Sequence, residues 1–324
     1  LSVVSTETRP AAALRNSIDL ARHVDGLGSV RYWLAEHHNL ASVASPAPDL
    51  MIGQIAAVTS RIRVGSGGVM LPNHAPLMVA ERFKMLEALY PGRIDLGLGR
   101  APGTDPATSY ALRRRQGITE EDDFLDRFNE LMLLESRAFP PGHPFANVTA
   151  MPSDVPLPPI YLLGSSDYSA QLAGHIGAAF GFAHHFATFD AGEAMRLYRE
   201  SFKPSPSHEK PYAILATHAL CADTDAEAER LAGTVDLDFV RRAKGEYLPL
   251  ASPDEAAAYD YAPADRARIA QNRTRMSVGS PETVKARLMP LIEATQAQEL
   301  MVTSMIHDHT ARKHSYELLA GIFA

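Results

Sequence analysis

The chain has 324 residues, of which 46% are hydrophobic and 21% are charged, a balance typical of a globular protein with a sizeable core. The net charge is −7 and the basic residues are dispersed, apart from three arginines at 113–115, so the sequence predicts no nucleic-acid partner. No run of about 18 apolar residues occurs, so we expect no membrane partner and a cytoplasmic location. The single cysteine, Cys221, excludes an intramolecular disulfide, and its apolar neighbours predict a small buried hydrophobe.

Short apolar runs alternate with longer amphipathic segments along the chain. Each apolar run predicts a buried strand, and the runs are residues 1–4, 31–36, 61–71, 92–99, 159–165, 178–183, 212–222 and 299–306. Helical spacing is found between them, as in residues 12–28, 49–60 and 75–92. Buried strands separated by helices are typical of βαβ units and of a parallel sheet. We therefore expect an α/β protein with a single (β/α)8 TIM barrel, forming one domain over residues 1–324.

Two proline-rich stretches interrupt this alternation. Residues 140–159 come after the fourth predicted strand, and residues 247–272 come after the seventh. Long loops in compact domains are commonly functional, as lids over active sites, so we expect both stretches to be extended loops near the mouth of the barrel.

Titratable side chains follow the second predicted strand, where the active site of such a barrel lies. These are Glu36, His37 and His38. A histidine near its neutral pKa can donate or abstract a proton at pH 7. Because neighbouring strand residues point to opposite faces, we expect only one of the two histidines to face the lumen.

Small residues follow the third predicted strand, at Ser66, Gly67 and Gly68. Glycine within a strand allows a ligand or another backbone to approach closely. A planar ring lying against this surface and a simple packing requirement are both consistent with the pattern.

Two further strand ends are candidate anion sites. Arg100 follows the fourth predicted strand in a glycine-rich run whose spacing fails the dinucleotide fingerprint, but its planar guanidinium suits phosphate. Residues Gly164, Ser165 and Ser166 precede a predicted helix, whose N-terminal amides and dipole favour an anion. An ordinary serine or aspartate cap is the alternative at this second place.

Histidines near the ends of the sixth and eighth predicted strands keep a metal-dependent barrel hydrolase open as an alternative, although we expect no metal. They are His184, His185, His307 and His309. His218 lies inside an apolar run and is expected to be a core histidine with its hydrogen bonds satisfied.

Three runs together resemble the bacterial luciferase-like flavin-dependent monooxygenases, the family of alkanal monooxygenase. They are RYWLAEHHN, RIRVGSGGVMLPNHAPLMVAERFKMLEALYPGRIDLGLGRAPGTD and YLLGSSDYSAQLA, and with the ending ELMVTSMIHDHTARKHSYELLA the resemblance covers nearly the whole chain. The order and spacing of these motifs are specific, whereas no single motif is.

The resemblance implies roles for several of the residues above. His37 corresponds to a base near the reactive flavin carbon, and Gly67–Gly68 to a non-prolyl cis peptide beneath the isoalloxazine ring. The FMN phosphate would be bound by Arg100 and by the main-chain amides of Ser165 and Tyr168. Asp167 departs from the small residues that the family has here, and its carboxylate would repel phosphate unless it points away.

The activity implied is that of a two-component monooxygenase, which uses reduced FMN from a separate flavin reductase and dioxygen to oxidise a small organic substrate. Relatives divide between FMN and deazaflavin, so a deazaflavin-dependent hydride-transfer enzyme stays open, as does a flavin-binding protein without turnover. Family members commonly form homodimers, and residues 49–58 and 79–89 have enough apolar surface for such an interface. The loop after the first strand is shorter than in the family, which suggests that residues are missing there.

Overall fold

Parallel strands and α-helices alternate along the chain in the computed structural model, which describes residues 1–101, 103–113 and 123–323. Two of the three arginines at 113–115 therefore lie outside the described residues. The chain divides into two compact units. Unit 1 comprises Leu1–Ser29, Leu40–Ala44 and Gly164–Ala324, and unit 2 comprises Val30–Asn39 and Ser45–Leu163. Among the described residues, no helix has the length and apolar character needed to cross a membrane.

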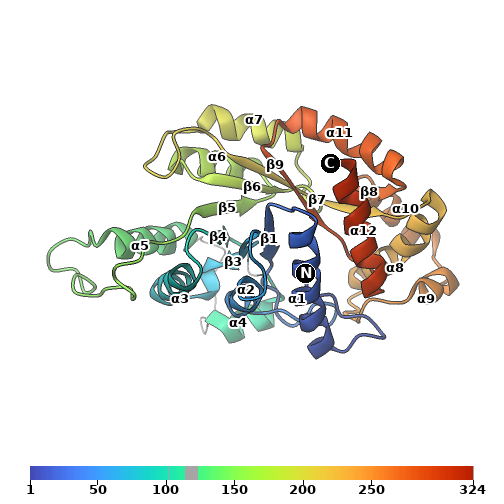
Figure 1. Ribbon diagram of the computed structural model, residues 1–324, viewed down its shortest axis with the longest axis horizontal. Helices are drawn as coiled ribbons and strands as arrows, with labels where there is room; N and C mark the ends of the chain where they lie inside the picture. The colour runs from blue at the N-terminus through green and yellow to red at the C-terminus, as the bar shows by residue number, and fades with distance from the viewer. Residues whose placement is uncertain (102, 114–122, 324) are drawn as a thin grey trace. The chain divides into compact units, whose positions relative to one another are not determined.

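Unit 2 contains a parallel sheet in the order β1-β2-β4-β5, with the short strand β3 also paired to β4. Its strands are β1 Arg31–Leu34, β2 Arg63–Ser66, β3 Val69–Met70, β4 Ile94–Gly99 and β5 Ile160–Gly164, whose last residue is assigned to unit 1. Its helices are α2 Pro48–Ala56, the 3-10 turn η1 Leu71–Asn73, α3 Pro76–Leu89, α4 Pro106–Arg113 and α5 Phe124–Ser136 (Figure 1).

The sequence explains how the helices of unit 2 begin and how they pack. Helices α2, α3 and α4 each begin at a proline, whose fixed φ suits the first turn of a helix, where no N–H partner is needed. Helix α3 buries Val79, Ala80 and Phe83 with helical spacing, and it lies beside α5 (Figure 1). Strand β4 is buried along its whole length, as expected for a central parallel strand. The carboxyl ends of β1, β2 and β4 therefore lie at one edge of this sheet.

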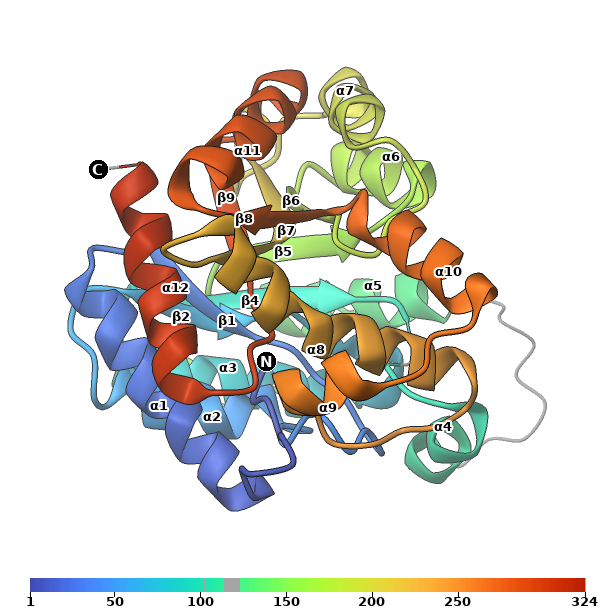
Figure 2. The same ribbon diagram turned by 90° about the vertical axis from the view of Figure 1, so that its right-hand side faces the viewer.

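Unit 1 is built around the long strand β7, which pairs in parallel with β6, β8 and β9. Its strands are β6 Ala179–Ala183, β7 Ala213–Cys221, β8 Met276–Gly279 and β9 Glu299–Thr303. Its helices are α1 Pro10–Gly26, α6 Asp167–Ile176, α7 Ala191–Ser201, α8 Asp225–Ala243, α9 Pro253–Ala258, α10 Pro263–Arg273, α11 Pro281–Thr295 and α12 His309–Ile322. Figure 2 shows α8 together with α9 and α10, which both pack against it.

Two strands share one edge of β7. Strand β6 pairs as far as Ala216, and β8 pairs from His218 onward. Because His218 has Met276 of β8 on one side, its other partner, Thr303 of β9, must occupy the opposite edge. The chain from Ala222, just after β7, to Gly279, the last residue of β8, begins and ends close together, because the N–H of Ala222 donates to the carbonyl of Gly279 at 3.2 Å.

One face of β7 packs on helices. Ala219 and Cys221 contact a cluster contributed by α11 and α12, which includes Val284, Leu288 and Leu319. Burial raises the pKa of the Cys221 thiol to about 11, which keeps it protonated at neutral pH. The prediction that Cys221 is a small buried hydrophobe is confirmed.

The parallel α/β organisation is confirmed, but the predicted count of eight strands is not. Residues 1–4 form no strand and make only an isolated antiparallel bridge between Val3 and Val43. Strand β8 was not predicted, because its residues follow a polar segment and number only four. The predicted run 61–71 is divided into β2 and β3, so the described residues contain nine strands.

The two proline-rich stretches differ from the extended loops that were predicted. Residues 247–272 contain α9 and most of α10, because Pro253 and Pro263 begin helices instead of interrupting them. Residues 140–159 are a loop, but this loop leads from α5 into the amino end of β5 (Figure 1). The loop therefore lies at the amino end of β5, whereas the candidate site residues of unit 2 follow the carboxyl ends of their strands.

Candidate active site

A buried carboxylate, Glu36, is the centre of a hydrogen-bonded cluster in unit 2. Glu36 comes just after β1 and is 0% exposed. It accepts hydrogen bonds from the main-chain N–H of Met70 at 2.9 Å and from Nδ2 of Asn73 at 3.1 Å. Its oxygens lie 2.9 Å from Nε2 of His38 and 2.9 Å from Nε2 of His74. Groups that follow β1 and β3 are thus joined through one side chain.

The charge state of Glu36 follows from two opposing effects. Burial alone would raise the pKa of this carboxyl, but the hydrogen bonds from His74, His38 and the main chain outweigh burial and lower the pKa. Glu36 is therefore ionised at neutral pH. A carboxylate in this position orients the imidazoles of His38 and His74 with Nε2 toward it, which leaves Nδ1 of each ring on the opposite side.

The turn that carries Asn73 and His74 is held by two helices. Nε of Arg113, at the end of α4, donates to Oδ1 of Asn73 at 2.9 Å. Nη1 of Arg127, in α5, donates to the carbonyl of His74 at 2.7 Å. His74 lies in one of the runs that resemble the family but was not predicted as a site residue, because only the 3-10 turn η1 brings it to Glu36.

Of the predicted pair of histidines, His38 contacts Glu36. His37 is half-buried, and its main-chain N–H lies 3.4 Å from the carbonyl of Ser45. Its predicted role as a base stays a prediction.

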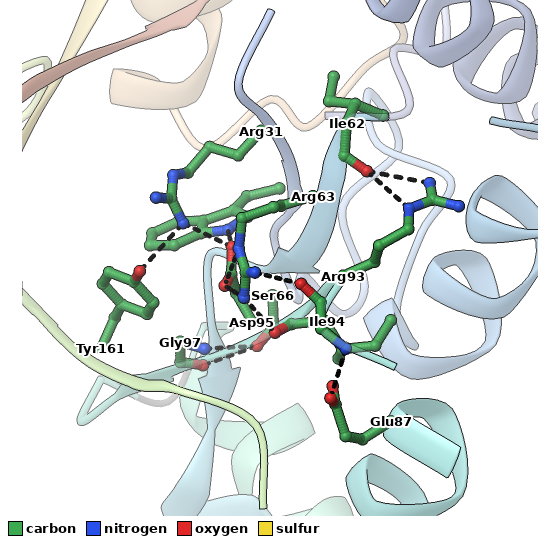
Figure 3. Close-up of polar contacts among 12 residues, drawn as sticks. Arg31, Ile62, Arg63, Ser66, Glu87, Arg93, Ile94, Asp95, Gly97 and Tyr161 are labelled. Atoms are coloured by element: carbon green, nitrogen blue, oxygen red, sulfur yellow. Dashed lines mark hydrogen bonds and ion pairs between the residues drawn. The ribbon is translucent and has the colours of Figure 1, made fainter. Parts of the chain in front are cut away.

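The peptide bond between Gly67 and Gly68 is cis, as the resemblance implied. A Cβ atom on Gly68 would lie 2.8 Å from the carbonyl oxygen of Gly97, so close packing of β3 against β4 accounts for this glycine. Ser66, predicted to bind the cofactor, is fully buried; its hydroxyl donates to the carbonyl of Gly97 at 2.8 Å and accepts from the N–H of Gly97 at 2.9 Å (Figure 3). Ser66 therefore joins neighbouring strands.

Arg100 directly follows β4, and its side chain is exposed. The loop after β4 reaches the segment after β1, because Oγ1 of Thr104 donates to the carbonyl of His38 at 3.0 Å. Arg100 and the Glu36 cluster are thus carried by connected segments of unit 2.

A second buried carboxylate, Asp95, lies near the amino end of β4 and was not predicted. It is 0% exposed, and its oxygens accept from Nη1 of Arg31 at 2.6 Å and from Nε of Arg63 at 2.9 Å (Figure 3). Nε1 of Trp33 donates to the same carboxylate at 3.0 Å. Arg31 also donates to the hydroxyl of Tyr161 at 3.1 Å. A lone aspartate inside the apolar run of β4 was the signal available in the sequence.

In unit 1, the predicted anion site at the start of α6 has the geometry of a helix cap. Ser166 and Ser169 form a reciprocal capping box, and Oδ1 of Asp167 accepts from the N–H of Tyr168 at 2.8 Å. Gly164 packs closely on Ser169, whose Oγ lies 2.1 Å from the position of an added Cβ. Ser165 is half-buried. The role of these residues in binding phosphate stays a prediction.

Two histidines of the metal alternative, His307 and His309, have separate partners in unit 1. Nε2 of His307 lies 3.0 Å from Oγ1 of Thr6, and Nε2 of His309 lies 2.8 Å from Oδ2 of Asp19. Across the described part of the chain, no group of three or more His, Cys, Asp or Glu side chains is placed to hold a metal ion. The described residues thus offer no ligand set for a hydrolytic metal.

His218 is buried, but the prediction that its hydrogen bonds are satisfied is wrong. It is 6% exposed, and neither ring nitrogen has a hydrogen-bond partner among the described residues. Burial, with help from nearby His185, Arg273 and Arg312, lowers the pKa of His218 to about 3. The ring is therefore neutral over the physiological range.

The chain is similar to known monooxygenases over nearly its whole length. The family model described as luciferase-like monooxygenase matches residues 1–298. A luciferase-like monooxygenase of Escherichia coli strain K12 is 43% identical over 310 residues, covering 96% of this chain and 91% of that protein. An N-acetyl-S-alkylcysteine monooxygenase of Bacillus subtilis strain 168 is 31% identical over 325 residues, covering 98% and 95%. The crystal structure of apo-MsnO8 has a TM-score of 0.89 and 40% identity, covering 99% of this chain and 95% of that one.

Two more distant structures share the fold. One is the oxygenating constituent of 3,6-diketocamphane monooxygenase from Pseudomonas putida in complex with FMN, with a TM-score of 0.68, 22% identity and coverage of 95% and 91%. The other is an F420-dependent secondary alcohol dehydrogenase, with a TM-score of 0.66, 14% identity and coverage of 98% and 96%. The family match and the relatives above 30% identity show that this chain belongs to the luciferase-like monooxygenase family.

Proposed function

We propose that this protein is the oxygenating component of a two-component monooxygenase that uses reduced FMN and dioxygen to oxidise a small organic substrate. The observation that carries the proposal is the buried Glu36 with its two half-buried histidines, in the same unit as the Gly67–Gly68 surface. Relatives named as monooxygenases support the reaction class. We also propose a flavin reductase as a transient partner and a cytoplasmic location.

The residues of unit 2 fit a flavin in two respects. Gly67 is half-buried and has no side chain, so a flat ring can approach its backbone closely. Arg100 is exposed at a strand end and carries the planar donor group that phosphate prefers. Bound reduced FMN would supply the electrons that activate dioxygen. Glu36 would keep the rings of His38 and His74 in one orientation, so that a ring nitrogen can hold or move a proton at the substrate or cofactor.

The start of α6 fits phosphate less well, since side chains already accept from the amides of Tyr168 and Ser169. A phosphate there would have to replace Asp167 as the partner of the Tyr168 amide. Arg100 is therefore the anchor that we propose first.

A deazaflavin-dependent hydride transfer is the alternative, favoured by the fold match to an F420-dependent alcohol dehydrogenase. Flavin binding without turnover is a further alternative. The buried Glu36 cluster argues against it, because storage of a flavin requires no oriented histidine.

Ligand titration of the purified protein under anaerobic conditions tests the proposal. The probes are FMN, reduced FMN, riboflavin and a deazaflavin, and the variants are Arg100→Ala and Arg196→Ala, an exposed arginine of α7 that serves as the control. We expect Arg100→Ala to weaken FMN binding about tenfold or more while riboflavin binding changes little, because a charged hydrogen bond to phosphate contributes about 1.5–3 kcal/mol. Binding of deazaflavin alone would support hydride transfer, and binding of no flavin would overturn the proposal.

We further propose a homodimer formed through α2 and α3. Both helices carry exposed apolar side chains, with Leu50 of α2 72% exposed and Met85 and Leu89 of α3 56% and 66% exposed. Light scattering after gel filtration should give twice the mass of one chain. The double variant Met85→Glu, Leu89→Glu should give a monomer, whereas Leu248→Glu, at an exposed apolar position of unit 1, should not.

A further inference from the structure

In the unit 2 sheet, a glycine on the middle of three neighbouring strands lets a tryptophan and an aspartate come into contact. Trp33 of β1 pairs with Gly65 of β2, and Gly65 pairs with Asp95 of β4. Because Gly65 has no side chain, Trp33 and Asp95 meet above it, with Nε1 and Oδ2 3.0 Å apart. A Cβ atom on Gly65 would lie 2.8 Å from Nε1 of Trp33 and 2.6 Å from Cβ of Asp95, so only glycine permits this contact.

The partners of Asp95 fix the indole. Arg31 and Arg63 both donate to the buried carboxylate, and the same carboxylate accepts from the indole N–H. The guanidinium of Arg31 lies 5.6 Å from the centre of the indole, and the ring of Tyr161 meets the indole edge-on at 4.9 Å. Trp33 is thus held at its nitrogen and by two neighbouring side chains.

The same side chain lies against Gly67 on the side of the ring nearest its Cβ. A Cβ atom on Gly67 would lie 3.1 Å from Cβ, 3.3 Å from Cε3 and 3.8 Å from Cδ2 of Trp33. On the other side of this segment, an added Cβ on Gly68 would meet Leu163 and the backbone of Gly97. The Gly67–Gly68 segment is therefore confined between Trp33 and β4.

We propose that Trp33, held by Asp95, is a positioning residue that sets the height and tilt of the Gly67–Gly68 surface, against which the ring of a bound flavin would lie. This inference rests on the proposed function, since it concerns the same surface. An indole has only two side-chain torsions, and both are fixed when its N–H is bound by Asp95 and its ring is packed against Tyr161. The surface above it is then ready for a planar ligand before that ligand arrives.

The first test compares Trp33→Phe with Tyr161→Phe. Both variants remove one hydrogen bond from the Asp95 cluster, but only Trp33→Phe releases from Asp95 the ring that contacts Gly67. We expect Trp33→Phe to weaken the binding of riboflavin and of FMN by the same factor, about tenfold, and to alter the visible absorption band of the bound flavin. Tyr161→Phe should change either dissociation constant by less than about twofold. These factors correspond to about 1.4 and 0.4 kcal/mol.

A merely structural role would lower the melting temperature in both variants and leave the dissociation constants of the folded proteins alike. That result, measured well below the melting temperatures, would overturn the inference while leaving the proposed function intact. If the wild-type protein binds no flavin, the proposed function itself fails, so the two failures are distinguishable.

The wild-type protein provides a second test that needs no variant, because Trp33 is the only tryptophan in the chain. Riboflavin bound on the Gly67–Gly68 surface would lie next to this indole, so we expect nearly complete loss of tryptophan emission at saturation. Flavin binding that leaves most of the emission in place would contradict the inference.

Discussion

Nε2 of His74 lies 2.9 Å from Oε2 of Glu36 across 38 residues of sequence, and this contact joins the end of β1 to the turn after β3. Four groups in total surround the Glu36 carboxylate. The stability of this part of unit 2 therefore depends on the ionised form of one side chain.

Glu36→Gln should destabilise the protein at pH 7 and should do so less at low pH. At pH 7 we expect the free energy of unfolding to fall by about 1–3 kcal/mol, because an amide cannot accept all the charged hydrogen bonds that the carboxylate accepts. The pKa of Glu36 is lower in the folded than in the unfolded state, so its contribution is fully present above the unfolded pKa, about 4.3, and is lost as pH falls through the folded pKa.

Urea unfolding at pH 7, 5 and 3.5 would measure this difference. Glu200→Gln is the control, because Glu200 is exposed and its ion pair with Arg196 contributes less than about 1 kcal/mol. If the difference in free energy of unfolding between wild type and Glu36→Gln does not decrease toward pH 3.5, the ionised state assigned to Glu36 is wrong.

Asp167→Asn should strengthen the binding of FMN without affecting riboflavin. If the amides at the start of α6 bind the phosphate, as the resemblance implies, the Asp167 carboxylate repels that phosphate, and asparagine in its place removes the charge. We expect a several-fold lower dissociation constant for FMN. Asp190→Asn, at the N-cap of α7, is the matched control. Equal changes for FMN and riboflavin would place the phosphate elsewhere.

Gly97→Ala should be strongly destabilising, because an added Cβ would lie 2.0 Å from the carbonyl oxygen of Ser66. Strands β2 and β4 would have to separate, and we expect a loss of about 3 kcal/mol or more. Gly321→Ala in α12 should instead stabilise by about 0.5–1 kcal/mol, since nothing lies within 4 Å of its added Cβ. Chemical denaturation measures both; a Gly97→Ala protein as stable as wild type would disprove the close approach of these strands.

His218→Leu should flatten the dependence of stability on pH. The folded pKa of His218 is about 3 and the unfolded value about 6.5, so the unfolded state binds more protons between these limits. Wild-type stability should therefore fall by about 1.4 kcal/mol per pH unit from this group as pH drops below 6.5, and the variant should lack that slope. Met276→Leu, at the position paired with His218, should keep the slope because it removes no titratable group.

The alternation of strands and helices was predictable, because it depends on apolar periodicity over many residues. Strand β8 was not, since four residues after a polar helix carry little pattern. Proline misled the prediction in residues 247–272, because it disfavours the interior of a helix but suits the first turn, where it begins α9 and α10.

The candidate site was predictable where chemistry clusters in sequence, as at Glu36 and His38. His74 and Asp95 could not be assigned, because their contacts depend on a 3-10 turn and on strand register. The cap at α6 shows the converse case. The same serine and aspartate pattern suits an anion and a helix start alike, and only the geometry shows that side chains occupy the amides.

The segment from Ala222 to Gly279 leaves β7 and returns to it at almost the same point. Residues inserted or deleted between these two ends therefore need not disturb the pairing of β7 with β6 or β9. A segment whose two ends lie close together can change in length and composition during evolution while β6, β7 and β9 stay in register. We expect members of this family to diverge most here, and chimaeras exchanged at Ala222 and Gly279 to fold.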